Sequence, residues 1–502
     1  MSSPGQTGFA KQSVRGAAWL FGAGYFSFVV NFVVNLLIAR LLDPQEFGIF
    51  AMAFAVIELA GVLAAFSVPL ALIHLDESEP HLFDTGVWLY FGIAFLNLVA
   101  AVGAACLLPG GLLSEAGRIL VVLGLSRVVL LMSQVSSAAI EKAFRYRTVS
   151  LIALATGAVP NFLALTLAWL GCGPWSLAAR EVVMALLSWA LLGAISPWRF
   201  RGGFDRGTAR KIYAFCVRMF VSRGLSIVLD RADRLIVGAV SGAAALGLYD
   251  RSRYISEMGV TLTRPVDGLT FNLYSRLRDS EERLRNAYTA LNYFLTRAMM
   301  GLSLVLFFYP TEIVLVLLGR TWLPAAPTLR WMAVYSGLLP LAYNLNQLLY
   351  GRGMMKDSNR AKLIQLLAFL PLFCFWLMRA GLPSAGFALF VGVAVGTAEM
   401  IRCQRSLLAP SLRELLAAPA AAAAAAALLL AALQGRRPPA DTVPAALGAL
   451  VVGGGLYAAL LFLIERRRLF DRLHFVLTQL RGEEGTPEPP VDGRTDARIG
   501  SA

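Results

Sequence analysis

Six charged side chains occur within one apolar stretch of this chain, residues 212 to 240. They are Arg218, Arg223, Asp230, Arg231, Asp233 and Arg234. At 100° per residue, Arg223, Asp230 and Arg234 share one helix face, which we expect to line a cleft. A guanidinium forks onto phosphate oxygens and stays charged at any accessible pH, so this face suits an anionic ligand. The alternative is a structural ion pair between Asp230 and Arg234, at i and i+4. Arg231 and Asp233 lie off the face, so at least one must contact another helix.

Two further arginines lie deep in apolar stretches. Arg127 has no acidic neighbour in its own helix, and Arg264 is followed by Pro265 and Asp267. Ionisable residues in such stretches are costly and normally face a bundle interior, and interrupted helices often mark ligand sites. The predicted contacts with an anionic group are Arg127, Arg223, Arg264, Arg231 and Arg234. The alternative for Arg127, Arg223 and Arg264 is an ion pair with a carboxylate on another helix.

Three pairs of polar residues are further candidates, namely Asn31 with Asn35, Arg180 with Glu181, and Asp230 with Asp233. The two asparagines are one helical turn apart and can hydrogen-bond a ligand or a facing helix. Arg180 and Glu181 are predicted near the external mouth, as part of a gate. The two aspartates could couple to protons or cations, but carboxylates paired with arginine stay ionised near neutrality, which argues against a proton relay.

These residues must be positioned by helices that cross a membrane. About fourteen apolar stretches, each about 18 to 28 residues long, fill the chain from Ala17 to Ile464, and about twenty helical residues cross a bilayer. No connection between them is long enough for a soluble domain. The sequence therefore predicts an all-α polytopic membrane protein with about 14 transmembrane helices.

Composition excludes several other classes. Hydrophobic residues make up 57 % and charged residues 15 % of the chain, whereas about a quarter of the residues in soluble domains are charged. The net charge of +14 comes without a soluble basic face, so nucleic-acid binding is not expected. The three histidines share no metal-ligand spacing, and the five cysteines lie in or beside apolar segments, so no metal site, disulfide framework or catalytic residue is predicted.

Basic residues concentrate in alternate loops, which predicts that both termini are cytoplasmic. One loop assigned to the cytoplasm does not follow this pattern, because residues 74 to 84 are acidic and include Asp76, Glu77, Glu79 and Asp84. Acidic residues have little weight in setting topology, so the assignment stands.

A repeat at an offset of 199 residues relates the two halves of the chain. It aligns Leu36–Ala39 with 235–238, and Phe47–Phe50 with 246–249. The copies occupy equivalent positions, which predicts two pseudo-symmetric six-helix bundles in parallel orientation. The predicted organisation is a cytoplasmic N-terminus (1–16), an N-terminal bundle (17–197), a cytoplasmic linker (198–211), a C-terminal bundle (212–402), two additional helices (403–465) and a cytoplasmic tail with a disordered distal part (466–502).

Three segments carry a resemblance to a known family. They are Asn35 to Gly48 (NLLIARLLDPQEFG), Asp230 to Gly238 (DRADRLIVG) running on to Leu246–Tyr249, and Leu349 to Gly353 (LYGRG). With them the chain resembles the oligosaccharide flippase branch of the multidrug/oligosaccharidyl-lipid/polysaccharide exporter superfamily, the Wzx-like exporters. The resemblance implies alternating-access transport of an undecaprenyl-pyrophosphate-linked oligosaccharide across a bacterial inner membrane, for exopolysaccharide, capsule or O-antigen synthesis.

The resemblance also sets expectations for ligands and partners. Pyrophosphate would contact the predicted arginines, and Asn31 and Asn35 could bind sugar hydroxyls. No cofactor is expected beyond a coupling ion, proton or sodium. A polymerase and an initiating transferase of the same pathway are the expected partners, and a monomer is the expected state because one chain provides both bundles.

Two other functions stay open from the sequence. A membrane-embedded glycosyltransferase or polymerase would also handle such lipids, and Asp43 with Glu46 superficially matches its acidic motif, but the external connections are short and Asp43-Pro44 is also an ordinary turn. An ion-coupled drug or metabolite exporter of the same superfamily would need fewer cations in its cavity than this chain carries.

Overall fold

The computed structural model describes residues 25, 28–61, 67–76, 79–107, 110–143, 145–434 and 443–481, and every regular element in these ranges is a helix. The N-terminal half contains a helix at Phe28–Leu41 followed by α2 (Pro44–Ala60), α3 (Val68–His74), α4 (Leu82–Leu107), η2 (Gly111–Leu113), α5 (Glu115–Lys142), α6 (Tyr146–Trp169) and α7 (Pro174–Ile195). The remainder contains α8 (Arg206–Ser256), α9 (Met258–Leu277), α10 (Glu281–Phe308), α11 (Pro310–Leu317), η3 (Arg320–Ala325), α12 (Ala326–Gly351), α13 (Met355–Ala380), α14 (Ser384–Cys403), α15 (Arg405–Gln434) and α16 (Val443–Arg481).

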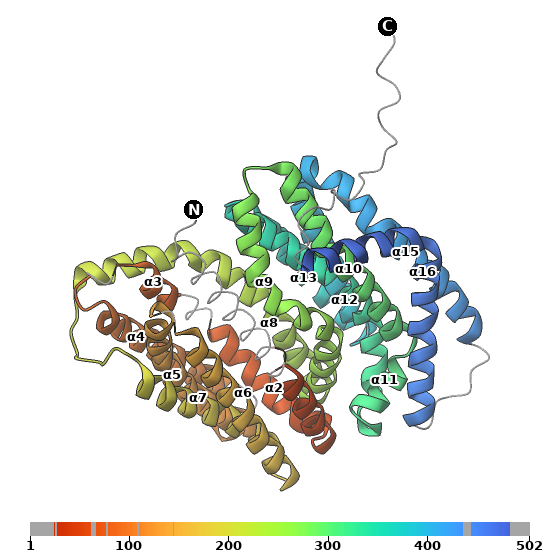
Figure 1. Ribbon diagram of the computed structural model, residues 1–502. Helices are drawn as coiled ribbons and strands as arrows, with labels where there is room; N and C mark the ends of the chain where they lie inside the picture. Colours follow the sequence, from red (N-terminus) through yellow and green to blue (C-terminus); the bar gives the residue numbers. More distant parts are fainter. Residues whose placement is uncertain are drawn as a thin grey trace.

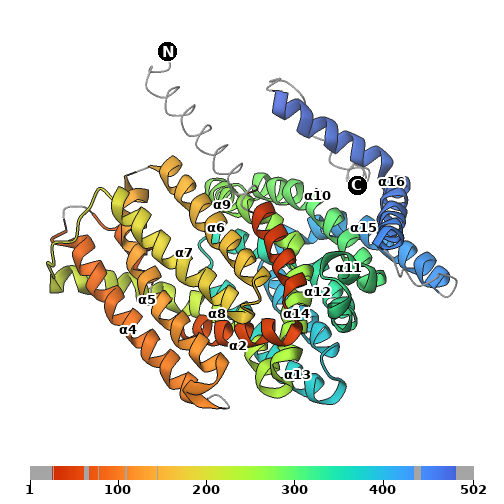
Figure 2. The ribbon, with the colours of Figure 1, turned by 90° about the horizontal axis from the view of Figure 1, so that it is seen from below.

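The helices form two lobes. In the N-terminal lobe α5 packs against α4 and α7, and in the C-terminal lobe α14 packs against α12 and α13. Figure 1 shows these groups side by side, with α15 and α16 at the outer edge of the C-terminal lobe. The most extensive contact between helices of different lobes joins α2 to α8, which lie centrally in Figure 2. The pseudo-symmetric pair predicted from the repeat therefore meets through these two helices.

Ten of the described helices are long and apolar enough to cross a membrane, which confirms an all-α polytopic architecture. The apolar pattern predicts one continuous span at residues 49–73 and another at 288–318, and both are wrong as continuous helices. The first is interrupted after Ala60, and the second ends at Phe308 before Pro310 begins α11. Proline favours the first turn of a helix and lacks the N–H that a continuing helix needs. The total of fourteen spans and the side on which the termini lie stay predictions.

Both copies of the repeat break their helix at the same register but by different means. In the first copy Asp43 caps α2: its Oδ1 accepts the Glu46 N–H at 2.8 Å, and the Glu46 carboxylate accepts the Asp43 N–H at 3.0 Å. This capping box accounts for both acidic residues structurally. In the second copy Gly242, 199 residues later, adopts φ 83° and bends α8. Glycine reaches this conformation without steric cost.

The two copies touch through their glycines. A Cβ at Gly48 would overlap the carbonyl oxygen of Ala243, and a Cβ at Gly247 would overlap that of Pro44. Gly48 and Gly247 are equivalent positions of the repeat. Only glycine permits two helix backbones to approach this closely, so the repeated glycine sets the distance between the lobes.

The acidic segment 74–84 docks on the linker between the lobes. Asp84 is buried and accepts the backbone N–H groups of Arg201 at 3.2 Å and Gly203 at 3.3 Å. Glu79 forms an ion pair with Lys211 at 2.6 Å. Helix α8 begins at Arg206, within the residues assigned to the linker. The acidic loop and the basic linker therefore lie side by side.

Asp205 caps α8 where the linker ends. Its Oδ2 accepts the Thr208 N–H at 2.6 Å, and this hydrogen bond lowers the pKa of the Asp205 carboxyl. We expect Asp205→Ala to speed amide hydrogen exchange in the first turn of α8, and Asp205→Asn to preserve protection, because both Asp and Asn are good N-caps. Since the pKa is lowered on folding, the contribution of the charged cap is present above the ordinary carboxyl pKa and lost as pH falls through the lowered value. Equal exchange in Asp205→Ala and wild type at neutral pH would contradict this role.

A buried ion pair attaches the last helix. Arg297 on α10 contacts both carboxylate oxygens of Glu465 on α16, at 2.6 and 2.7 Å, and its guanidinium lies 3.4 Å from the Tyr293 ring centroid. The Tyr457 hydroxyl donates to the Arg297 carbonyl at 2.9 Å. None of these residues was among the predicted candidates. They secure α16 against the second lobe.

Candidate functional site

A single carboxylate is shared by two arginines where the lobes meet. Glu58 of α2 forms an ion pair with Arg127 of α5, and its other oxygen lies 3.4 Å from Nη2 of Arg231 on α8. The three side chains are 21, 23 and 27 % exposed. The partial exposure of the two guanidinium groups leaves donors available to a ligand. Arg127 therefore has the interhelical partner that the alternative interpretation described.

Glu58 was not predicted as a site residue, although the repeat contains a signal for it. The residue 199 positions later is Glu257, so both copies carry a carboxylate at the same register. Glu257 accepts hydrogen bonds from Nε of Arg253 at 2.7 Å and from the Tyr335 hydroxyl at 3.0 Å. Equivalent glutamates thus anchor one charged cluster in each lobe.

The predicted polar pairs of the N-terminal lobe form one network. Nε and Nη2 of Arg180 donate to Glu181 Oε1 at 3.1 and 2.9 Å, and Nη1 of Arg180 donates to Asn35 Oδ1 at 3.2 Å. Asn31 accepts a hydrogen bond from Asn161 of α6. Both asparagines therefore contact a facing helix, the alternative to a ligand contact. The gating role of Arg180 and Glu181 stays a prediction.

The second lobe holds a buried network around Asp233. This side chain is fully buried, forms an ion pair with Arg253, and accepts the Tyr249 hydroxyl at 2.5 Å. Asp233 lies off the predicted face, as expected, and its contacts lie beyond the Gly242 bend. Its partners Tyr249 and Arg253 were not among the predicted site residues, whereas Arg264 was. The side chain of Arg264 lies outside the described residues.

The ion pair considered between Asp230 and Arg234 is wrong. Nε of Arg234 contacts Asp250 at 2.6 Å, and from Asp230 it takes only the backbone carbonyl, through Nη1 at 2.7 Å. The cause is the bend at Gly242, which folds the second part of α8 back toward the first. Asp250, sixteen positions away in the sequence, then reaches the Arg234 guanidinium, whereas the side chain of Asp230, one turn away, does not.

The predicted face of Arg223, Asp230 and Arg234 does not act as a unit. Arg223 is exposed and pairs with no carboxylate in the described part of the chain, Asp230 lines a cavity in the second lobe, and Arg234 is satisfied by Asp250. The structure instead joins Arg231 to Arg127 through Glu58. Neighbouring helices, rather than the phase of α8 alone, decide which charges meet.

On one side of the charged cluster the lobes are closed against each other. Nε of Arg40 donates to the Leu317 carbonyl at 3.1 Å, and the Trp322 indole N–H donates to the Ala39 carbonyl at 2.6 Å. Arg251 is buried with its guanidinium 3.9 Å from the ring centroid of Phe47 in the other lobe. Such stacking replaces hydrogen bonds that a buried guanidinium would otherwise need. The distribution of basic residues predicts that this closure is on the external side.

The charged cluster between the lobes is suited to binding an anionic ligand. Among the described residues there is no group of three or more His, Cys, Asp or Glu side chains that could hold a metal ion. Its arginines are fixed in position by carboxylates and backbone carbonyls, and the least buried of them surround Glu58. Two helical lobes within a membrane, joined at a charged interface, define a class of membrane transporter.

Comparison with known proteins identifies the family. The model of the polysaccharide biosynthesis protein family matches residues 37–327, so this chain belongs to that family. The succinoglycan biosynthesis transport protein ExoT of Rhizobium meliloti is 24 % identical over 335 residues, covering 66 % of this chain and 67 % of the relative. The lipopolysaccharide biosynthesis protein WzxC of Escherichia coli is 21 % identical over 374 residues, covering 72 and 74 %.

Solved structures show the same fold. The lipid II flippase MurJ in an inward closed conformation has a TM-score of 0.67 at 13 % identity, covering 90 % of this chain and 99 % of that one. An inward-facing multidrug resistance MATE transporter of the MOP superfamily has a TM-score of 0.57 at 12 % identity, covering 79 and 99 %. The predicted resemblance is confirmed. The chain is a transporter rather than an enzyme, and a multi-pass protein of the bacterial inner membrane.

Proposed function

We propose that this protein is a flippase that moves polyprenyl-pyrophosphate-linked oligosaccharide units between the leaflets of the inner membrane by alternating access. The observation that carries the proposal is the shared carboxylate between the lobes, with Arg127 on one side and Arg231 on the other. The names of ExoT and WzxC, which refer to polysaccharide transport and lipopolysaccharide biosynthesis, support this class of cargo.

The geometry suggests how cargo binding is linked to lobe movement. A pyrophosphate presents several anionic oxygens and competes with Glu58 for the forked donors of Arg127 and Arg231. Because Glu58 and Arg127 belong to one lobe and Arg231 to the other, displacing the carboxylate exchanges a bridge through Glu58 for a bridge through the ligand. A ligand shifts a conformational equilibrium only by its differential affinity for the two states, and a ligand that needs both arginines binds best in the state that holds them at the matching separation.

The proposal requires no cofactor, and a proton or sodium ion would serve as the coupling ion if transport is energised by a gradient. The initiating transferase and polymerase of the pathway would supply and consume the cargo. One chain provides both lobes, so a monomer is sufficient. An ion-coupled exporter of drugs or metabolites is the alternative function, and no contact described above favours it.

The test is transfer of a fluorescent undecaprenyl-pyrophosphate oligosaccharide in proteoliposomes. We expect Arg127→Ala and Arg231→Ala to slow transfer by about ten- to a hundredfold, the effect of losing a hydrogen bond to a charged group. The transfer rate of Arg127→Lys should lie between those of the wild type and Arg127→Ala, because lysine keeps the charge but not the forked pair of donors. The matched control is Arg278→Ala, since Arg278 is 61 % exposed and pairs only with exposed Asp279. No protein-dependent transfer would refute the function, whereas transfer unaffected by these variants would refute the site.

A further inference from the structure

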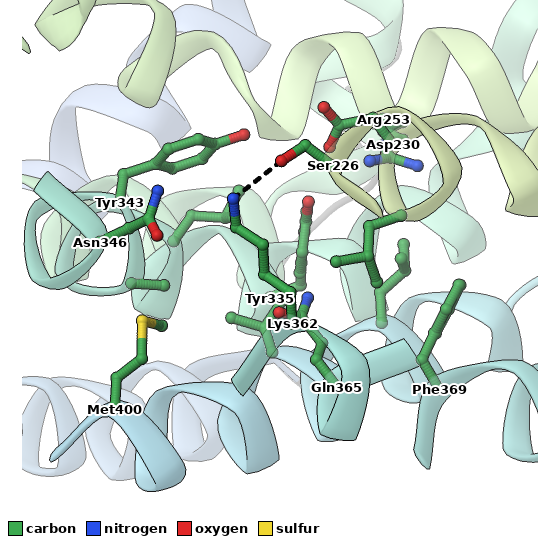
Figure 3. A pocket seen from close by; sticks show the side chains of 15 residues that line it. Ser226, Asp230, Arg253, Tyr335, Tyr343, Asn346, Lys362, Gln365, Phe369 and Met400 are labelled. Carbon is green, nitrogen blue, oxygen red and sulfur yellow. Dashed lines mark hydrogen bonds between the residues drawn. The ribbon is translucent and has the colours of Figure 1, made fainter. Parts of the chain in front are cut away.

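A cavity of about 120 Å³ lies among the helices of the C-terminal lobe, and neither Glu58 nor Arg127 lines it. Its walls come from α8, α12, α13 and α14, and the polar groups include Asp230, Asn346, Lys362 and Gln365. Figure 3 shows Lys362 extending from α13 into the cavity toward Ser226, with Asp230 and Arg253 along the same wall as Ser226. At about 15 Å³ for each water, the space holds roughly eight waters, comparable with one sugar ring.

Lys362 is a cation without a counterion. Its Nζ donates to Ser226 Oγ at 2.8 Å and to the Tyr350 hydroxyl at 2.7 Å, both neutral groups. No ion pair joins it to any acidic side chain in the described part of the chain. An ammonium has three donors, so one N–H remains for the cavity. Unpaired charges in membrane-spanning helices are costly and mark functional sites.

Other polar groups of the cavity wall also have hydrogen-bond donors or acceptors that are available to a ligand. Asp230 forms no ion pair, and its side chain accepts no hydrogen bond from the described residues. Asn346 Oδ1 accepts the Ser358 hydroxyl at 2.5 Å, which leaves its amide donors available. The amide of Gln365 adds both a donor and an acceptor. The wall therefore offers donors and acceptors together, beside the apolar surface of Phe369.

This mixture discriminates between ligand classes. A pyrophosphate accepts hydrogen bonds only and would leave the acceptors of Asp230 and Gln365 without a donor, while a metal ion would leave the Lys362 ammonium without a partner. A sugar hydroxyl both donates and accepts, and the C–H face of a pyranose packs on an apolar wall. A neutral hydroxyl-rich ring matches these donors and acceptors together.

We propose that this cavity is a saccharide subsite, which receives one neutral sugar residue of the cargo while the Arg127–Glu58–Arg231 cluster receives the pyrophosphate. The inference rests on the proposed flippase function. Asp230, Lys362 and Gln365 hold the sugar hydroxyls, and Phe369 supports the ring. The subsite makes the glycan, and not only the lipid carrier, part of what the protein recognises.

The test measures binding to the purified full-length protein, with two probes. One is undecaprenyl pyrophosphate carrying a glucosyl-galactose disaccharide, and the other is bare undecaprenyl pyrophosphate. We expect Lys362→Met and Gln365→Leu to weaken binding of the glycosylated probe by about tenfold and to leave the bare probe unchanged. The control is Lys356→Met, which removes an exposed lysine of the same helix outside the cavity.

Each outcome decides the proposal. Equal loss for both probes would show that Lys362 acts on the pyrophosphate or on folding, and unchanged binding of both would show that the cavity is no subsite; either result overturns it. Thermal midpoints of the variants distinguish misfolding from lost contacts. Binding is measured separately from transfer. Absence of transfer by the wild type would refute the proposed function. The difference in binding between the two probes would still show whether the cavity binds a sugar.

Discussion

Replacing Gly48 with leucine is expected to abolish closure between the lobes and to reduce transport by about a hundredfold. A side chain at this position would meet the backbone carbonyl of Ala243, and backbone cannot move aside as a flexible side chain would. Overpacking costs typically about 1–3 kcal/mol, and about 3 kcal/mol against the closed state shifts a two-state population by roughly a hundredfold. The equivalent substitution Gly247→Leu should have the same effect, because Gly247 meets Pro44 in the same way.

Closure can be measured independently of transport. Arg40 reaches the Val316 carbonyl across the closed side through the length of its side chain, so cysteines at these two positions should be joined by a bifunctional thiol reagent of similar length in the protein that retains Gly48 and poorly in Gly48→Leu. The matched control is Gly103→Leu on α4, where an added Cβ meets nothing within 4 Å. Normal transport with normal cross-linking in Gly48→Leu would show that the lobes do not meet through the two glycines.

Replacing Asp233 with asparagine is expected to destabilise the second lobe by about 3–5 kcal/mol, the usual cost of breaking a buried ion pair. Asp233 is fully buried between Arg253 and the Tyr249 hydroxyl, so the variant leaves the Arg253 guanidinium with only Glu257 as a charged partner. The measurement is the thermal midpoint in detergent. Asp279→Asn is the control, since Asp279 is 89 % exposed and its pair is worth little.

A second variant separates the lost charge from the lost packing. The double substitution Asp233→Leu with Arg253→Met removes both charges and should recover part of the stability, because apolar residues of similar volume often replace a buried ion pair without loss. A midpoint for Asp233→Asn equal to that of the wild type would contradict the stabilising role of this pair. A double variant less stable than Asp233→Asn would show that Tyr249 and Glu257 depend on the charges.

The membrane class, the family and the internal symmetry can all be predicted from the amino-acid sequence. Apolar stretches of sufficient length require helices, because a bilayer leaves no other way to satisfy backbone hydrogen bonds. The offset of 199 residues identified Gly48 and Gly247 as equivalent before their contact was known. The sequence also indicates Arg127 and Arg231 as functional candidates, because a charge within an apolar helix is costly wherever that helix packs.

Which charges meet depends on how the helices pack against one another. The partner of Arg127 is Glu58 on another helix, and the partner of Arg234 is Asp250 beyond the bend at Gly242. Helical periodicity predicts which residues share a face of one helix, but not the rotation and distance of the neighbouring helix that faces it. The cavity around Lys362 has the same origin, because its walls come from four helices that are adjacent only after packing.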